Sequence, residues 1–500
     1  MRQNIAALLA ASLLLGLCAG CGASDEKAES ADTSKSVYVA YDAGATAQEA
    51  AAEEEKQEKV FVIYCIGEDF RNRVRDFYPG YESEGEDSGR IGDVRVQWNV
   101  YSDAQEYRED LDERLGMQAD RDTGALKEDS GPNEKVDLFV VDEAFLRDYV
   151  ESGWSLDVKA GAGLTEEELS DQFLYTQQMA TDAEGKLKAV SWQATPGVFA
   201  YRRSIAKEVL GTDEPEKVQE AVSDWETFAQ TAQTMKEAGY YMLSAYGDAY
   251  RVYADNVTSA WVEDGALNID PHLEDWAVQT REFAENGYIH GTEQWSEEWR
   301  ADHTGDGEVF GFFYSSWGIH YTLQRKADGE TDSEEDGGEE SEEVSSASGD
   351  YAVCRGPEPS HYGGQWIIAA AGGDDTELAG SIMRELTCNP EIMKKITRDI
   401  REVTNTVSGM TELGQSDYKA EVLGGQNPIP VYVESAKLLS KRHTTSYDDD
   451  LDLGFQVTMQ DYFDGKVSET DALETFRKVA LSRYEELEDV SGDEEGEEEE

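Results

Sequence analysis

Basic residues are scarce in this chain of 500 residues. It contains 43 Lys and Arg against 107 Asp and Glu, so its formal net charge is −64. A surface of this sign repels nucleic acid and anionic lipid, and neither is expected as a partner. Part of the acid is segregated, because residues 328–350 and 485–500 each contain 11 acidic residues and no basic one. Such stretches are typical of solvated, disordered segments rather than of a core.

Cysteine and histidine are also few, with five and six residues respectively. Three of the cysteines, Cys65, Cys354 and Cys388, lie in the body of the chain, and an odd, widely spaced set is not a disulfide framework. A bond between Cys65 and Cys354 is the one pairing to consider, and buried free thiols are the alternative. The histidines lack the spacing of metal ligands, so no metal and no cofactor is expected.

Catalytic motifs are missing as well. The chain has no G-x-S-x-G, no H-E-x-x-H, no Walker loop and no G-x-G-x-x-G. Carboxylates are so numerous that a pair suited to glycoside hydrolysis would arise by chance, so enzyme activity has no positive support. Adjacent Tyr240 and Tyr241 suggest ferric iron binding, but they lead into a predicted strand, and strand packing is the better interpretation.

Long hydrophobic runs are absent except at the N-terminus. The run from Ile5 to Leu17 follows Arg2 and has the length of a signal peptide core rather than of a membrane span. It ends in LCAGC, which resembles a bacterial lipobox and predicts cleavage before Cys21, with lipid such as palmitate on the Cys21 thiol. Cys18 and Cys21 also spell a C-x-x-C redox motif, but cleavage would separate them. We therefore expect the mature chain on the outer face of the cell membrane.

Enough apolar material is nevertheless present for a folded protein. The chain is 39 % hydrophobic and contains 10 Trp, 25 Tyr and 15 Phe. Its length exceeds what one hydrophobic core accommodates, so two lobes are expected. Residues 308–322, EVFGFFYSSWGIHYT, concentrate aromatic residues without a basic one. Phe310, Phe312 and Phe313 there are expected to pack within a strand.

Alternating strands and helices are predicted at the start of the folded region. Val60–Ile66 and Val136–Val141 are continuous apolar runs, and Val94–Val100 alternates between apolar and polar residues. Each run precedes an amphipathic helical pattern, which predicts an α/β fold with a doubly wound parallel sheet. Trp366–Ala371 is a further predicted strand, and residues 468–486 form the last predicted helix.

Six segments in order resemble the extracellular solute-binding proteins of bacterial carbohydrate ABC transporters, the family 1 class that includes maltose-binding protein. Among them, VSDWETFAQTAQTMKEAG (222–239) resembles the Trp-containing helix of that family, and GEVFGFFYSSWGI (307–319) resembles its strand before a ligand-stacking Trp. The others are GKLKAVSWQATPGVFAYRRSIAKEVLG (185–211), WVEDGALNIDP (261–271), GGQWIIAAAGGDDTELAGSIMRELTCNPE (363–391) and FDGKVSETDALETFRKV (463–479). The resemblance spans roughly residues 59–488.

The resemblance implies a two-lobed periplasmic-binding-protein fold of type II, with hinge-connected lobes and the ligand cleft between them. It implies a monomer that captures a sugar or oligosaccharide and delivers it to the permease subunits of an ABC importer, without covalent chemistry. The expected organisation is a signal peptide (1–20), a flexible acidic linker (21–58), two lobes and an acidic tail (489–500). The N-terminal lobe is expected over 59–153 and 320–390, with a disordered acidic insert at 328–350, and the C-terminal lobe over 154–319 and 391–488.

Sugar binding needs aromatic rings for C–H faces and carboxylates or amides for hydroxyl groups. Asp69 has an alternative role as a helix N-cap and Trp366 one in core packing. Thr195 stands where maltose-binding protein has a carboxylate, which leaves the identity of the sugar open. The ligand-binding residues implied by the resemblance are Glu68, Asp69, Trp192, Gln193, Thr195, Asp248, Tyr250, Trp317 and Trp366.

Three other hypotheses stay open from the sequence. The same fold could bind a polyamine or another cation, which the acidity favours. The chain could be a secreted carbohydrate-active enzyme. It could also be a surface protein with a degenerate cleft.

Overall fold

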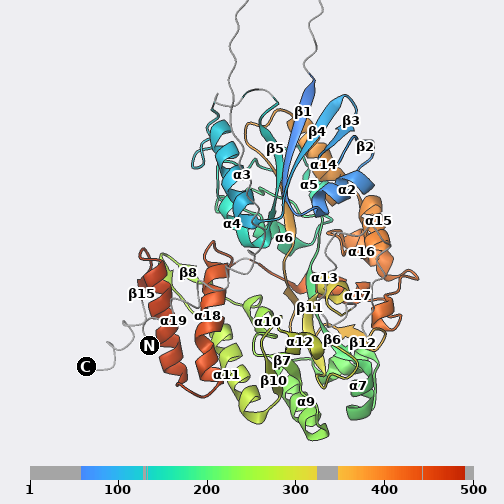
Figure 1. Ribbon diagram of the computed structural model, residues 1–500, viewed down its shortest axis with the longest axis vertical. Coiled ribbons are helices and arrows are strands. Elements are labelled where there is room, and N and C mark those ends of the chain that lie inside the picture. Colours follow the sequence, from blue (N-terminus) through green and yellow to red (C-terminus); the bar gives the residue numbers. More distant parts are fainter. Residues whose placement is uncertain (1–57, 128–130, 132, 324–346, 442, 490–500) are drawn as a thin grey trace, which may run out of the picture. The chain divides into compact units, whose positions relative to one another are not determined.

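The computed structural model describes residues 58–127, 131, 133–323, 347–441 and 443–489 (Figure 1). The predicted signal peptide, Cys21, nearly all of the linker and tail, and most of the acidic insert lie outside the described residues. Within them, every helix is too short or too polar to cross a bilayer.

The first sheet has six strands in the order β14-β5-β1-β4-β3-β2. Strands β1 (Lys59–Ile66), β4 (Val94–Tyr101) and β5 (Val136–Asp142) are its parallel centre, which confirms the parallel arrangement predicted for the three runs. Residues 61–65 of β1 and every residue of β5 except Asp142 are buried, as expected for strands at the centre of a sheet covered on both faces. Each of these strands is followed, as predicted, by a helix: α2 (Asp69–Phe77), α3 (Ala104–Gln118) and α4 (Glu143–Val150).

The two edges of the first sheet are antiparallel, which the sequence did not predict. On one edge, β2 (Tyr81–Ser83) and β3 (Ser88–Ile91) form a hairpin beside β4. On the other, β14 (Gln365–Ala369) pairs antiparallel with β5, and Gln365 lies opposite Asp142 at the carboxyl end of β5. The direction of β14 follows from its entry, because the chain reaches the sheet at this carboxyl edge.

The second sheet is built around β6 (Pro196–Arg202). Strands β11 (Gly311–Ser315), β12 (Tyr351–Cys354) and β13 (Ser360–His361) all pair antiparallel with β6. Strand pairing therefore groups 351–361 with the second sheet, which corrects the prediction that 320–390 belongs to the N-terminal lobe. The physical reason is that the chain pairs along β6 before it crosses to the first sheet at β14.

A parallel pair of strands lies beside β11. It consists of β7 (Leu243–Ala245) and β10 (Ile289–Thr292). A parallel bridge between Tyr241 and Val309 joins the start of β7 to the start of β11. Strands β10, β7 and β11 thus run in one direction and end at one edge.

The end of the acidic insert is ordered. Ala347 is buried, and a carboxylate oxygen of Asp350 accepts a hydrogen bond of 2.9 Å from Nε of Arg202. Asp350 also accepts from the backbone N of Ser204 at 2.9 Å. The predicted disorder of 328–350 is therefore wrong for 347–350, because the buried Arg202 guanidinium holds this carboxylate in place.

Apolar side chains gather in two clusters, one around the first sheet and β6, the other among α9, α11, α18 and α19. Cys65 and Cys354 are buried and unbonded, and Cys388 is partly buried, so the free-thiol alternative is confirmed. The helices not yet given are α5 (Glu166–Leu169), α6 (Leu174–Met179), α7 (Arg203–Val209), α8 (Pro215–Ala221), α9 (Trp225–Ala238), α10 (Tyr250–Ala254), α11 (Pro271–Asn286), α12 (Glu297–Ala301), α13 (Ser316–Tyr321), α14 (Thr376–Cys388), α15 (Pro390–Ile400), α16 (Val407–Gly414), α17 (Ile429–Leu438), α18 (Asp448–Phe463) and α19 (Glu469–Arg483). Short strands β8 (Val262–Glu263), β9 (Ala266–Leu267) and β15 (Glu488–Asp489) and a 3-10 turn, η1 (Glu421–Leu423), complete the elements.

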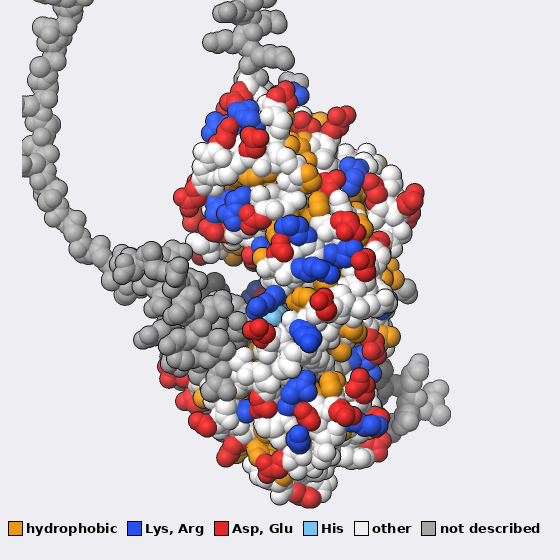
Figure 2. All heavy atoms as spheres, turned by 90° about the vertical axis from the view of Figure 1, so that its right-hand side faces the viewer, with side chains coloured by type: hydrophobic (Ala, Val, Ile, Leu, Met, Phe, Trp, Pro, Cys, Tyr) orange, Lys and Arg blue, Asp and Glu red, His pale blue; other side chains and the backbone are white. Residues whose placement is uncertain are grey.

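Basic side chains are dispersed among acidic ones on the face that carries α2, α15 and α16 (Figure 2). Ion pairs account for this mixing, as between Nζ of Lys394 and Glu412 at 2.7 Å and between Nζ of Lys395 and Asp399 at 2.6 Å. The basic side chains of these pairs are therefore neutralised by neighbouring carboxylates.

Candidate functional site

Two antiparallel segments, 190–196 and 361–365, connect the sheets and are called the crossing segments here. Val190 bridges Ile367 of β14, and β6 begins at Pro196. The backbone N of Tyr362 donates to the carbonyl of Thr195 at 3.2 Å, and the Thr195 hydroxyl donates to the carbonyl of Gly363 at 2.6 Å. The two segments are thus bonded to each other where the chain leaves one sheet for the other.

Glycine is required in the second crossing segment. Gly363 and Gly364 have φ values of 70° and 130°, which side-chain-bearing residues rarely adopt. A Cβ atom on Gly364 would also lie 3.2 Å from the Trp366 ring. The Gly-Gly pair therefore permits the close approach of the two crossing segments.

Polar side chains form a network around Glu402, at the edge where the parallel strands of the first sheet end. Gln193 Nε2 donates to the Glu402 carboxylate, Trp192 Nε1 lies 3.3 Å from it, and Arg73 Nε donates to it at 2.7 Å. Arg73 also pairs with Asp69 at 3.6 Å. The network therefore joins α2, the first crossing segment and the loop after α15.

The carboxyl end of β5 adds a second polar group to this edge. Gln365 Nε2 donates to Asp142 at 2.8 Å, and its backbone N donates to Gln193 Oε1 at 3.0 Å. Burial raises the pKa of Asp142 above its ordinary value, although the Gln365 hydrogen bond opposes the rise. Amide and carboxylate groups of this kind are the ones that bind hydroxyl groups of a polar ligand.

Exposed aromatic rings lie just beyond β10 and β11 of the second lobe and in the second crossing segment. Among the residues whose exposure the structure describes, three aromatic side chains are at least 36 % exposed: Trp295 (41 %), Tyr362 (39 %) and Trp317 (36 %). The rings of Trp317 and Tyr362 lie 5.8 Å apart at 31°, and Trp317 Nε1 donates to the Tyr362 carbonyl at 2.9 Å. Exposed, fixed rings are costly to leave in water and are typical of ligand contacts.

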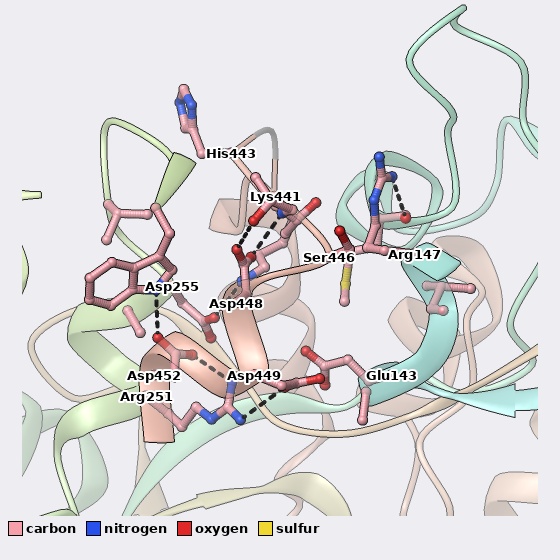
Figure 3. Close-up of a pocket in the computed structure, with 18 of the residues that line it drawn as sticks. Glu143, Arg147, Arg251, Asp255, Lys441, His443, Ser446, Asp448, Asp449 and Asp452 are labelled. Carbon is pink, nitrogen blue, oxygen red and sulfur yellow. Dashed lines mark hydrogen bonds and ion pairs between the residues drawn. The ribbon is translucent and has the colours of Figure 1, made fainter. Parts of the chain in front are cut away.

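A cavity of about 70 Å³, whose lining is drawn in Figure 3, is connected to the ring pair through one side chain. Arg251 links the two, since its guanidinium lies 5.1 Å over the Tyr362 ring and also lines the cavity. In the cavity Arg251 pairs with Asp449 at 4.0 Å and with Asp452 at 3.6 Å. The charged lining comes from α4, α10 and its C-cap, the N-cap of α11, the segment after α17 and the start of α18: Glu143, Arg147, Asp148, Arg251, Asp255, Asp270, Lys441, Asp448, Asp449 and Asp452.

The cavity therefore has seven carboxylates against three Lys or Arg side chains and one histidine, His443. Burial, together with the nearby Asp452 charge, raises the pKa of Asp448 to about 7, although bonds from Thr445 oppose the rise. Burial also raises the pKa of Asp449, and the nearby Glu143 and Asp452 carboxylates add to this. The arrangement can hold a cationic group or donate and accept hydrogen bonds.

A buried chain of charges joins the two sheets beside this cavity. The fully buried His361 imidazole contacts Glu143 through Nε2 and Asp255 through Nδ1, each at 2.9 Å. Lys441 Nζ donates to the other oxygen of Asp255 at 2.8 Å. Burial opposes the charged form of His361, but the two carboxylates outweigh it and raise its pKa to about 9. Burial likewise opposes the charge on Glu143, yet His361 lowers the pKa of Glu143 to about 2. We call Glu143, His361, Asp255 and Lys441 the buried charge chain.

Four of the predicted ligand-binding residues lie at this site with exposed or partly exposed side chains. Glu68 and Asp69 begin α2 next to the carboxyl end of β1, Gln193 belongs to the Glu402 network, and Trp317 to the ring pair. The N-cap alternative for Asp69 is wrong, because Glu68 occupies the N-cap position and neither carboxylate caps the helix.

Three other predicted residues lie at the site but are buried beneath it. Trp192 and Trp366 are 0 % and 1 % exposed, and Trp366 Nε1 donates to the carbonyl of Thr176 at 3.1 Å. Thr195 is buried with its hydroxyl bonded to Gly363. Direct ligand contact by these side chains stays a prediction, and the tertiary fold packs them under the crossing segments.

Asp248 and Tyr250 are likewise buried, and their polar side-chain atoms are hydrogen-bonded within the protein. Asp248 accepts from the backbone N of Ser244 and Ala245 and from Trp299 Nε1 at 3.1 Å. Burial, opposed by these bonds, raises the pKa of Asp248 to about 6. The Tyr250 hydroxyl donates to Asp452 at 2.6 Å. Their role as direct ligand contacts stays a prediction, and in this structure each positions a neighbouring side chain.

The sequence did not single out Glu402, Arg251, Tyr362 or Trp295. Tyr362 alone had a usable signal, since it precedes the Gly363-Gly364 pair that marks a close approach of backbone. The described residues contain no cluster of three His, Cys, Asp or Glu side chains able to hold a metal ion.

Comparison with known proteins agrees with this architecture. The family model for bacterial extracellular solute-binding proteins matches residues 117–421. Among solved structures, an extracellular solute-binding protein of family 1 is similar with a TM-score of 0.67 and 14 % identity, covering 85 % of this chain and 99 % of that one. No curated protein sequence matches the chain.

Two further similar structures come from named bacteria. The sugar-binding protein MalE of Xanthomonas citri has a TM-score of 0.62 and 11 % identity, covering 85 % of this chain and 98 % of its own. The cyclic alpha-maltosyl-1,6-maltose binding protein of Arthrobacter globiformis has a TM-score of 0.58 and 12 % identity, with coverage of 85 % and 98 %. At such identities the likeness establishes the two-lobed α/β fold. With more than half of its length matched by the family model, this chain belongs to the bacterial extracellular solute-binding proteins.

Proposed function

We propose that this protein captures a sugar or oligosaccharide outside the cell and delivers it to an ABC importer, held at the membrane by lipid on Cys21. The observation that carries the proposal is the exposed Trp317–Tyr362 ring pair beside the carboxylate and amide groups of the Glu402 network. The rings match the C–H faces of a sugar, and the polar groups match its hydroxyls. The MalE and maltosyl-maltose binding structures share the fold and are named for sugar ligands.

The proposed mechanism is binding and closure without covalent chemistry. The crossing segments 190–196 and 361–365 act as the hinge in this proposal, and the two lobes close on the ligand. The lobes comprise the first sheet with its helices and the second sheet with its helices. Small-angle scattering with and without saturating ligand should show a decrease in the radius of gyration on binding.

Replacing the stacking ring tests the site. Trp317→Ala should weaken sugar binding by about 1–3 kcal/mol, as measured by isothermal titration calorimetry with saccharides from a glycan panel. Val278→Ala is a matched control, since Val278 is an exposed apolar residue on α11, outside the ring pair and the cavity lining. An unchanged affinity in a folded Trp317→Ala variant would show that the site is elsewhere.

A second candidate ligand is a polyamine or another organic cation. The observation that favours it is the cavity, whose seven carboxylates outnumber its three Lys or Arg side chains and one histidine and whose lining has Trp261 as its one large aromatic residue. Titration with spermidine separates the two candidates. Spermidine binding that is lost in Asp449→Asn, with no heat from any saccharide, would replace the sugar proposal.

A further inference from the structure

Trp295 is the most exposed large aromatic residue among those whose exposure the structure describes, at 41 %. It lies between the end of β10 and the start of α12 and has a φ of 71°, a value that residues other than Gly, Asn and Asp seldom adopt. Left-handed backbone in such a residue costs about 1–3 kcal/mol and tends to occur at functional positions. Both the exposure and the backbone of Trp295 therefore call for an explanation other than packing.

The Trp295 ring is held in place from below. It lies 4.9 Å from the ring of Trp299, which is 1 % exposed. Trp299 is itself fixed, because its Nε1 donates to Asp248 at 3.1 Å and the His303 ring lies 4.3 Å from its own. A rigid, exposed ring loses little conformational entropy when a ligand stacks on it.

Side chains with hydrogen-bond acceptor oxygens lie in the loop between β10 and α12, which contains Trp295. An open hollow is lined by Thr292, Glu293, Ser296 and Glu298 among others, which lie on both sides of Trp295 in the sequence, and the two glutamates are exposed. Hydroxyl and carboxylate oxygens beside a flat ring are the combination that a sugar requires, as at Trp317.

Trp295 and Trp317 also lie at one edge of the fold. Strands β10, β7 and β11 run in the same direction, Trp295 follows β10, and Trp317 follows β11 after two serines. Strand β7 lies between the other two, so the strands that lead to the two rings are separated by two strand spacings, or about 10 Å. This separation exceeds one pyranose ring and suits linked sugars.

We propose that Trp295 forms a second stacking platform, so that the ligand is an oligosaccharide that spans Trp295 and Trp317 and not a single sugar. The proposal rests on the proposed sugar-binding function and extends it by naming the size class of the ligand. Asp248 supports this second platform indirectly, as a positioning residue that holds the Trp299 ring under Trp295.

Calorimetry on the full chain tests this with a series of one to five linked hexoses. Trp295→Ala should weaken binding of the longer saccharides about tenfold or more and leave binding of the monosaccharide unchanged. Trp295→Phe keeps a ring and should retain most of the affinity. Trp317→Ala should weaken every member of the series.

The outcomes separate the two proposals. If Trp317→Ala weakens binding while Trp295→Ala binds every saccharide like the wild type, the second platform is refuted and the sugar function stands. If Trp295→Ala and Trp295→Phe lose monosaccharide and oligosaccharide binding equally, the second platform is also refuted, because the effect does not depend on ligand length. If the wild type binds no member of the series, both proposals fail.

Discussion

Replacing His361 by Gln should destabilise the protein strongly, because it removes the central cation of the buried charge chain. His361 lies on β13 of the second sheet and contacts Glu143 at the start of α4 and Asp255 at the end of α10. With both ring nitrogens facing carboxylates, the imidazole donates from each and is positively charged. Glutamine has similar reach and no charge, so the variant removes the cation that contacts Glu143 and leaves Lys441 as the remaining cation that contacts Asp255.

The size of the effect follows from burial. Removing one partner of a buried ion pair costs about 3–5 kcal/mol, because a charge stays buried without compensation. The pKa of His361 gives a similar value, since its rise from 6.5 to about 9 corresponds to about 3 kcal/mol at 1.36 kcal/mol per pKa unit. A loss of about 3 kcal/mol in the free energy of unfolding is therefore expected.

The buried charge chain also predicts how the free energy of unfolding depends on pH. Because the folded-state pKa of His361 is raised, its contribution is complete below pH 6.5 and is lost as pH rises through about 9. The pKa of Glu143 is lowered from 4.5 to about 2, so its contribution is present above pH 4.5 and is lost as pH falls toward 2. The cluster stabilises the fold most between pH 4.5 and 6.5.

Urea unfolding followed by tryptophan fluorescence measures the free energy of unfolding of both proteins at each pH. The difference between wild type and His361→Gln should be about 3 kcal/mol near pH 6 and should shrink above about pH 9.5, where His361 is neutral in both folded and unfolded states. Arg483→Gln is the control, because its exposed pair with Asp450 is worth about 0–1 kcal/mol. A His361→Gln variant within about 1 kcal/mol of the wild type at pH 6 would refute the reasoning.

Two further predictions concern the backbone and the N-terminus. Gly364→Ala should lower the free energy of unfolding by about 1–3 kcal/mol, because φ is 130° there and the new methyl group would meet the Trp366 ring; Gly85→Ala, in an exposed turn with ordinary φ, is the control for urea unfolding. Cys21→Ala should abolish lipid attachment and release the protein from the membrane fraction, which metabolic labelling with a fatty acid and cell fractionation measure; labelling that persists in the variant would contradict the lipobox assignment.

Local patterns were enough to predict the centre of the first sheet. The apolar runs of β1 and β5 and the alternation in β4 depend only on neighbouring residues, and the structure confirms these strands within about one residue. The antiparallel direction of β14 and the pairing of β12 with β6 depend on partners far along the chain, so the sequence pattern contained no signal for them.

The candidate site was predicted in part. Trp317, which was predicted to contact ligand, is exposed because it lies just beyond the end of a strand whose phenylalanines are largely buried. Trp192 and Trp366 are buried, since an indole suits a core as well as a sugar site and composition alone does not distinguish the two. Trp295 was missed because its exposure results from an unusual backbone angle and from the support of Trp299.

The sequence by itself determined the acidity of the chain, the parallel centre of the first sheet and the order of segments that resembles the solute-binding proteins, because each depends on residues close together in the chain. The tertiary structure alone decided which rings face solvent and which charges neutralise one another. Glu143 and His361 are 218 positions apart and meet through one hydrogen bond. Contacts of this kind depend on how two sheets come together, and no local pattern of residues encodes that arrangement.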